Sequence, residues 1–134
     1  MNDFKPTVVI ADDDPEMLGV VAKLLNSKFT VVGRAGDGFA ALKAIKEFRP
    51  QLAILDISMP KINGLDVAKQ LNKAQSLTKV VFLSLLIGED FIAEARRCAH
   101  GYVTKMRLHS DLYPALYAAL EGKFFASDFV DLRA

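Results

Sequence analysis

The sequence predicts an α/β fold in which a doubly wound, five-stranded parallel sheet carries helices on both faces. The first observation is that short β-rich runs alternate with segments of helical period along the chain. The second is that these runs are almost wholly apolar, which is typical of sheets covered on both faces. The third is that 134 residues with 51% hydrophobic and 25% charged residues match one globular domain. Right-handed crossovers then favour the doubly wound topology.

Each predicted strand is a short apolar run that ends where the pattern breaks. The first run contains three β-branched residues and stops at three aspartates. The glycines at 36 and 38 break the chain after the second run, and the fourth run is the most apolar. The predicted strands cover residues 7–11, 29–33, 51–56, 79–84 and 101–105.

Apolar residues that recur every three or four positions predict a helix after each strand. Asp14 and Pro15 open the first helix, because Asp is a good N-cap and Pro is tolerated at the first helical position. The last helix contains Pro114, which we expect only in its first turn, and it ends near Gly122. The predicted helices lie at about residues 15–25, 39–48, 65–72, 91–98 and 112–120.

Polar residues follow four of the predicted strands, and in such sheets the carboxyl ends of the strands form the ligand site. These residues are Asp12, Asp13 and Asp14 after the first strand, Asp56 after the third, Ser84 at the end of the fourth and Lys105 after the fifth. Singly, each is more often an N-cap, a turn residue or a solvated side chain. Together, at one edge of one sheet, these residues predict a ligand-binding site.

The chemistry of these side chains indicates a metal-assisted phosphoryl site. Two carboxylates about 4 Å apart repel by roughly 4 kcal/mol at an effective dielectric of about 20, so the cluster needs a cation. Oxygen ligands without His or Cys favour Mg²⁺. Lys105 could hold a phosphoryl oxygen as a point charge, and Ser84 could donate a hydrogen bond to another. These are the components of phosphoryl transfer.

Three segments resemble the receiver domains of two-component response regulators, and the resemblance extends over about residues 6–122. The segments are residues 8–15, 52–64 and 101–105. The most specific pattern is Asp56 at a strand end, followed by Met59-Pro60 and then by Gly64. The resemblance implies the strand order 2-1-3-4-5 in a flavodoxin-like, three-layer sandwich.

The resemblance also implies roles for the site residues. Asp56 would accept a phosphoryl group from a sensor histidine kinase, and Lys105 would pair with that group. Mg²⁺ would be held by Asp12, Asp13, Asp56 and the backbone carbonyl of Ser58. Ser84 would move to the phosphoryl group and Tyr102 would then turn inward, which switches the face of the fourth helix, fifth strand and fifth helix. Gly64 would permit the turn into the third helix through a positive φ.

Two further segments are similar to receivers of LuxR-type (NarL/FixJ-like) transcription factors: residues 33–38 and residues 121–127. We therefore expect a receiver domain at 1–122 and, at 123–134, the start of a linker to an absent DNA-binding domain or the extension of a stand-alone receiver. DNA would be bound only through that missing domain. Tyr113 and Tyr117 on the last helix mark either the margin of the core or a homodimer surface. An exposed pair at Phe124 and Phe125 would indicate packing against another domain.

Other features limit the function or leave alternatives open. Leu85 follows Ser84 where the family mostly has a small residue, so it could narrow access to Asp56 and slow phosphorylation. Asp12 and Asp14 resemble the nucleophile motif of haloacid-dehalogenase-type phosphatases, although Pro15-Glu-Met follows them. A flavodoxin-like cofactor binder would need a phosphate loop after the first strand, which is absent from the sequence. We expect a signalling domain, not an enzyme.

Composition sets the remaining bounds. The 17 basic and 16 acidic residues give a net charge of +1, which offers no basic field for nucleic acid. No apolar stretch approaches the roughly 18 residues of a membrane span, and the first residues lack the pattern of a signal peptide. One cysteine excludes an internal disulfide framework. These features favour a cytoplasmic domain without a membrane partner. His100 and His109 are expected at the surface or in loops.

Overall fold

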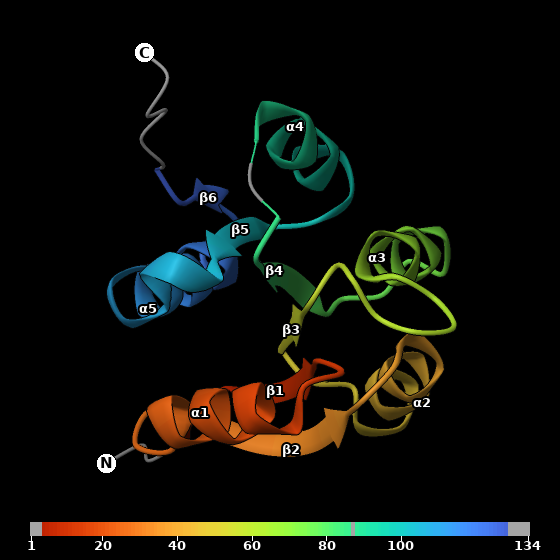
Figure 1. Ribbon diagram of the computed structural model, residues 1–134. Coiled ribbons are helices and arrows are strands. Elements are labelled where there is room, and N and C mark those ends of the chain that lie inside the picture. The colour runs from red at the N-terminus through yellow and green to blue at the C-terminus, as the bar shows by residue number, and fades with distance from the viewer. Residues whose placement is uncertain (1–3, 87, 129–134) are drawn as a thin grey trace.

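The computed structural model describes residues 4–86 and 88–128 of the chain, and it has a parallel sheet between two layers of helices (Figure 1). The sheet has six strands in the order β2-β1-β3-β4-β5-β6, and every neighbouring pair is parallel. The strands are β1 (Thr7–Ala11), β2 (Thr30–Ala35), β3 (Leu52–Leu55), β4 (Lys79–Ser84), β5 (Gly101–Thr104) and β6 (Phe125–Ala126). The helices are α1 (Pro15–Leu25), α2 (Gly38–Phe48), α3 (Gly64–Lys73), α4 (Glu89–Cys98), the 3₁₀ turn η1 (Lys105–Arg107) and α5 (Leu108–Leu120).

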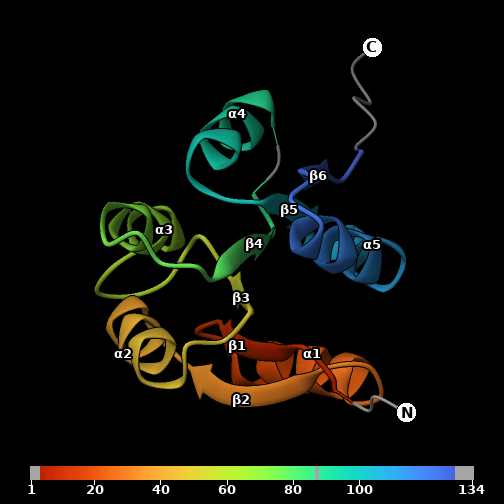
Figure 2. The same cartoon turned by 180° about the vertical axis from the view of Figure 1, so that it is seen from behind.

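Helices cover both faces of the sheet, as the two opposite views show (Figures 1 and 2). Helices α1 and α5 pack on one face over a core that includes Leu25, Phe29 and Leu116. Helices α2, α3 and α4 pack on the other face over a core that includes Leu55 and Phe82. Strands β1, β3 and β4 lie between the two layers, and the apolar side chains of the central strands are buried on both sides.

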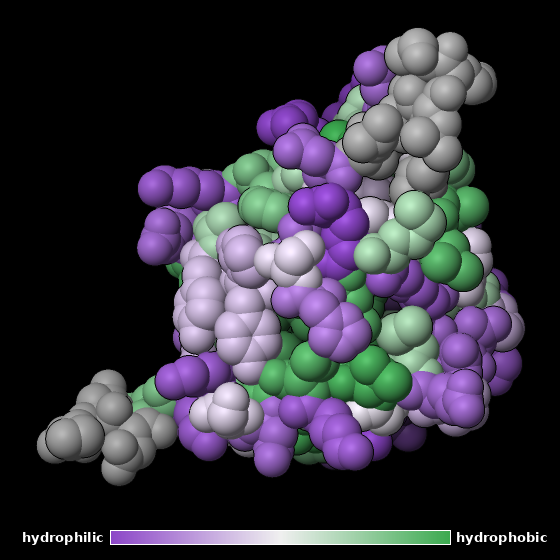
Figure 3. All heavy atoms as spheres, turned by 60° about the vertical axis from the view of Figure 1, so that its left-hand side comes forward, coloured by the Kyte–Doolittle hydropathy of each residue, from purple (hydrophilic) through white to green (hydrophobic). Residues whose placement is uncertain are grey.

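The outer side of the α1 and α5 layer shows hydrophobic surface interrupted by hydrophilic side chains (Figure 3). Val20 of α1 and Tyr117 of α5 are among its exposed large hydrophobic residues. Among the described residues, no helix is long and apolar enough to span a membrane.

The predicted α/β class and the order 2-1-3-4-5 are confirmed, but the predicted count of five strands is wrong. The additional strand β6 pairs with β5 in the register Gly101↔Phe125 and Tyr102↔Ala126. A strand of two residues is too short to show an alternating pattern. The residues that follow α5 therefore extend the sheet, and residues 129–134 of the expected linker lie outside the described residues.

Pro114 corrects a second expectation, because it lies in the interior of α5 rather than in its first turn. The helix begins at Leu108, directly after the 3₁₀ turn η1. Proline has no N–H to donate to the carbonyl four residues earlier, which here belongs to Ser110. Ser110 is exposed, so that carbonyl can bond to water instead.

His100 lies in the loop between α4 and β5, as expected, but it is half-buried, and Nδ1 of its ring accepts a hydrogen bond from the backbone N–H of Val80 at 3.0 Å. Phe124 and Phe125 are also half-buried. Phe124 packs against the core beneath the guanidinium of Arg96, which lies 4.5 Å from the ring centroid. These phenylalanines are therefore partly covered by the domain itself and do not form an exposed pair.

Candidate functional site

The structure brings four of the predicted strand-end residues together at the carboxyl edge of the sheet: Asp12, Asp13, Asp56 and Lys105. Asp12 follows β1 and Asp56 follows β3, and both side chains are buried, whereas Asp13 is exposed. One carboxylate oxygen from each of these three residues lies within 4.8 Å of the other two. Backbone hydrogen bonds fix the strand ends. The N–H of Asp12 donates to the carbonyl of Ala35, and the N–H of Asp56 donates to the carbonyl of Ala11.

Lys105 places its ammonium between two of these carboxylates. Its Nζ lies 2.8 Å from Oδ2 of Asp12 and 3.1 Å from Oδ2 of Asp56. Burial raises the pKa of Asp56, and repulsion by Asp12 adds to the rise, against the opposing effect of the lysine. Burial alone would lower the pKa of Lys105, but its bonds to the two carboxylates outweigh burial and raise it. The lysine is therefore held as a cation within a site that carries excess negative charge.

The remaining carboxylate oxygens are oriented by the backbone. Oδ1 of Asp12 accepts from the N–H of Asp14 at 2.9 Å, and Oδ1 of Asp56 accepts from the N–H of Ser58 at 3.3 Å. Asp14 is an N-cap, because its carboxylate accepts from the N–H of Glu16 and opens α1. Of the three consecutive aspartates, Asp12 and Asp13 therefore contribute to the cluster and Asp14 begins the helix.

The donor set fits a hard divalent cation. All candidate ligand atoms are carboxylate oxygens, without sulfur or nitrogen, and they converge on one point. The bridging position of the Lys105 ammonium shows that this point attracts positive charge. Ser58 adjoins the cluster through its N–H bond to Asp56, so its carbonyl oxygen belongs to the same loop.

Gly64 begins α3 for a reason other than the expected one. Its φ is not positive; the helix is instead capped by Asn63, whose side chain accepts from the N–H of Asp66 at 2.8 Å. A β-carbon at Gly64 would lie 2.2 Å from the carbonyl oxygen of Asp56. Gly38 approaches the same loop, and a β-carbon there would lie 2.0 Å from the carbonyl oxygen of Ile62. The two glycines allow the loop after Asp56 to pack tightly.

The two predicted switch residues are both buried. Ser84 ends β4, and its Oγ accepts a hydrogen bond from the N–H of Leu86 at 3.1 Å. Tyr102 is 1% exposed and already points into the core, so the outward starting position that the resemblance implies is not observed. Its hydroxyl has no hydrogen-bond partner within the described structure. Burial, together with the nearby charge of Asp56, raises the pKa of Tyr102 to about 12.

A hollow of about 510 Å³ adjoins the aspartates, and its lining includes Asp13, Ser58, Leu86 and Phe91. Leu85 is 66% exposed and does not line this hollow.

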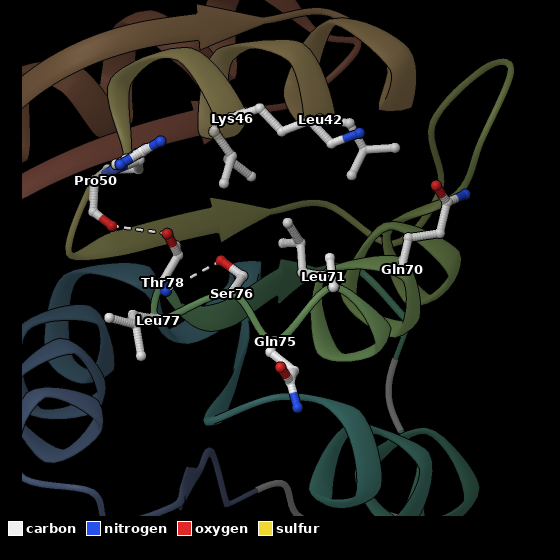
Figure 4. Close-up of a pocket in the computed structure, with 12 residues that line it drawn as sticks. Leu42, Lys46, Pro50, Gln70, Leu71, Gln75, Ser76, Leu77 and Thr78 are labelled. Atoms are coloured by element: carbon white, nitrogen blue, oxygen red, sulfur yellow. Dashed lines mark hydrogen bonds between the residues drawn. The ribbon is translucent and has the colours of Figure 1, made fainter.

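A separate pocket of about 570 Å³ lies at the opposite edge of the sheet, between α2 and the end of α3 (Figure 4). In it, the hydroxyl of Thr78 donates to the carbonyl of Pro50 at 2.8 Å. This second pocket is remote from the aspartates, because it lies where β3 and β4 begin.

Sequence reasoning missed one polar cluster beside the site, which is centred on Asp111 of α5 and Ser127. Both side chains are buried, and Oγ of Ser127 donates to Oδ2 of Asp111 at 2.7 Å. One signal was available: Asp111 lies on the apolar stripe of α5 that includes Leu108, Leu112 and Ala115. A carboxylate at such a position needs buried partners.

A family model described as the response regulator receiver domain matches residues 8–117. The chain belongs to this family. Receiver domains act in phosphorylation-controlled signalling, and the aspartate cluster occupies the edge of the sheet at which such chemistry is expected.

The receiver is similar to transcriptional response regulators. It is 33% identical over 126 residues to the uncharacterized transcriptional regulatory protein YxjL of Bacillus subtilis, covering 92% of this chain and 58% of the relative. It is 31% identical over 132 residues to the nitrate/nitrite response regulator protein NarL of Escherichia coli K12, covering 96% and 61%. The chain therefore spans about three fifths of the length of these relatives.

A solved structure of similar fold is the isolated receiver (REC) domain of RcsB from Salmonella enterica serovar Typhimurium, determined with the phosphomimetic BeF₃⁻. The two chains superpose with a TM-score of 0.84 at 25% identity, and the match covers 93% of this chain and 95% of the other. The receiver fold therefore accounts for nearly all of the chain.

Proposed function

We propose that this receiver accepts a phosphoryl group on Asp56 from a sensor histidine kinase. The observation that carries the proposal is the convergence of Asp12, Asp13 and Lys105 on the carboxylate of Asp56. A lone buried aspartate would be a poor phosphoryl acceptor, because its charge repels the incoming phosphoryl oxygens. The ammonium of Lys105, together with a metal ion held by the aspartates, would offset that repulsion.

The proposed transfer requires little from the protein except position and charge. A carboxylate oxygen of Asp56 attacks phosphorus, the P–N bond of the phosphohistidine breaks, and the imidazole retains the electron pair and takes up a proton. Lys105 is placed to pair with a phosphoryl oxygen, since its ammonium already lies 3.1 Å from Asp56. Ser84, at the end of the adjacent strand, would donate a hydrogen bond to another oxygen.

Mg²⁺ is the cofactor that the site would hold, through Asp12, Asp13, Asp56 and the carbonyl of Ser58. When bound, it would supply positive charge to the phosphoryl oxygens. Asp12 and Asp56 would each then share their charge between the ion and Lys105.

We further propose that the receiver controls transcription through a DNA-binding domain outside this chain. The names and greater lengths of YxjL and NarL support this output. A stand-alone receiver that acts by binding another protein is the second candidate. A homodimer is compatible with either, and Tyr117 is the candidate contact because it is 43% exposed. Tyr113 fits the margin of the core, since its hydroxyl donates to the carbonyl of Leu24 and its ring packs against Phe29.

The test is intact-mass measurement after incubation with Mg²⁺ and acetyl phosphate. We expect one added phosphoryl group on the wild-type chain, none on Asp56→Asn, and wild-type labelling of Asp66→Asn, which changes an exposed aspartate of α3 outside the site. Labelling of Asp56→Asn, mapped to Asp12, would instead support the haloacid-dehalogenase-like alternative. Absence of any adduct on the wild-type chain would contradict phosphorylation from a small donor.

A further inference from the structure

After α5, the chain pairs with β5 through β6, and the buried residue Ser127 that follows β6 bonds to the end of β5. Its N–H donates to the carbonyl of Tyr102 at 2.8 Å, and its Oγ accepts from the N–H of Thr104 at 3.2 Å. The same hydroxyl donates to Oδ2 of Asp111 in α5 at 2.7 Å. Ser127, Thr104 and Asp111 are 4%, 1% and 7% exposed, so water cannot readily replace these bonds.

The hydrogen bonds of Asp111 fix the position of the Ser127 hydroxyl. Its Oδ1 accepts from the hydroxyl of Ser110 at 2.9 Å, and its Oδ2 accepts from Nε of Arg107 at 3.0 Å as well as from Ser127. Burial alone would raise the pKa of this carboxyl, but the bonds from Ser127, Ser110 and Arg107 outweigh burial and lower it. Removing one hydrogen-bond donor from a buried carboxylate costs folding free energy. The bond to Asp111 therefore holds Ser127 firmly in place.

Residues 124–127, which we call the C-terminal segment, lie beside β5, between α4 and α5 (Figure 1). The residues of this segment other than Ser127 also attach it to the domain. Arg96 of α4 lies over the ring of Phe124, and Phe125 packs against the core beneath α5. The segment therefore contacts a helix on each side of the sheet as well as the strand between them.

The attachment point adjoins the proposed phosphorylation site. Thr104, whose N–H is held by Ser127, immediately precedes Lys105, whose ammonium bridges Asp12 and Asp56. Because the peptide link between Thr104 and Lys105 is stiff, Ser127 restrains the point from which the lysine side chain begins. A displacement of the Lys105 backbone would therefore also displace Thr104 and strain its bond to the hydroxyl of Ser127.

We infer that Ser127 and Asp111 form a positioning pair that holds Lys105 on the free carboxylate of Asp56, and that the C-terminal segment therefore responds to phosphorylation. This inference rests on the proposed function. The oxygens of an acyl phosphate lie farther from the Asp56 backbone than Oδ2 does, so a lysine that follows them moves outward and pulls on Thr104. Docking of the segment and phosphorylation then oppose each other, and by linkage each weakens the other equally.

The coupling predicts a result that a purely structural role for Ser127 would not produce. The Ser127→Ala variant of the full 134-residue chain should bind beryllium fluoride, with Mg²⁺ present, about three- to tenfold more tightly than the wild type. Affinity is measured by titration with backbone amide NMR. The matched control is Ser110→Ala, which removes another donor to Asp111 but does not touch β5 or the segment, and which should stay within about twofold of the wild type. Ser127→Thr keeps the hydroxyl and should restore wild-type affinity.

The same titration has a second readout. Amide hydrogen exchange at Ala126 and Ser127 should accelerate when beryllium fluoride binds the wild-type chain, since the segment loosens. Asp111→Asn, which weakens the network without removing the hydroxyl of Ser127, should shift affinity in the same direction by a smaller factor.

Three results would overturn the inference: unchanged or weaker binding by Ser127→Ala, an equal effect of Ser110→Ala, or slower exchange at Ser127 in the bound state. Failure of the wild-type chain to bind beryllium fluoride at all would instead contradict the proposed function. The two failures are therefore distinguishable in one experiment.

Discussion

Gly64 lies against the backbone of Asp56 so closely that a β-carbon on the glycine would be 2.2 Å from the aspartate's carbonyl oxygen. No residue with a β-carbon fits at this distance without a backbone shift. The N–H of Gly64 also donates to the carbonyl of Ile57 at 2.8 Å. The start of α3 therefore sets the path of the loop that carries Ser58 and orients the proposed phosphoacceptor.

Gly64→Ala should lower the free energy of unfolding by about 1–3 kcal/mol, because it forces a backbone contact in a packed region to open. Urea unfolding measures the change. Gly19→Ala is the matched control: it lies in the exposed interior of α1 with nothing within 4 Å of the added atom, so it should stabilise the chain by about 0.5–1 kcal/mol. A Gly64→Ala variant as stable as the wild type would contradict the close approach.

Lys105→Ala should destabilise the chain by about 2 kcal/mol in the absence of Mg²⁺, because it leaves two buried carboxylates without their cation. Added Mg²⁺ should recover more stability in this variant than in the wild type, since the carboxylates remain available to the ion. Thermal unfolding with and without MgCl₂ tests both statements. Lys61→Ala, which removes an exposed partner of Asp37, should show neither effect. Loss of the Mg²⁺ response in Lys105→Ala would mean that the lysine is needed to hold the ion.

Two tyrosines should respond to loss of their hydroxyls in opposite directions. Tyr102→Phe removes a buried hydroxyl that has no partner in the described structure, and should stabilise the chain by about 1 kcal/mol. Tyr113→Phe removes a bond to the carbonyl of Leu24 and should destabilise it by about 1 kcal/mol. Chemical denaturation of both variants provides the comparison. Destabilisation by Tyr102→Phe would show that its hydroxyl has a partner in solution.

Stability should fall as the pH is lowered past the titration range of histidine. Burial, with a contribution from Lys79, lowers the pKa of His100 below its unfolded value of about 6.5. The folded state therefore favours the neutral ring, whose Nδ1 accepts a hydrogen bond from the N–H of Val80. The stability that the neutral ring contributes is fully present above the unfolded pKa and is lost as the pH falls through the folded pKa. Urea unfolding between about pH 7.5 and pH 5 measures the loss.

The control for this pH effect is the second histidine. His109→Gln changes an exposed residue and should keep the wild-type pH dependence, whereas His100→Gln should flatten it. The same slope in all three proteins would show that another group is responsible.

Much of the site could be predicted because it depends on local pattern. Asp12, Asp56, Ser84 and Lys105 each follow or end an apolar run, and a parallel sheet necessarily brings its carboxyl ends to one edge. Asp14 beside Pro15 likewise marked the start of α1 through short-range capping chemistry. These features can be predicted from the order of the strands and helices alone, and hydrophobic periodicity predicts that order.

Other features depend on contacts between residues distant in sequence, and no local pattern reports them. The pairing of Ser127 with Thr104, and of β6 with β5, arises only after α5 has folded back along the sheet. The inward position of Tyr102 and the acceptor role of His100 are likewise set by neighbours from other elements. The sequence by itself determined the strands β1 to β5, the helices between them and the edge at which the acidic side chains gather, because hydrophobic periodicity and strand direction are local properties. Only the tertiary structure decided that Lys105 bridges Asp12 and Asp56 and that Ser127 bonds to the strand that precedes it, because these bonds depend on distances across the fold.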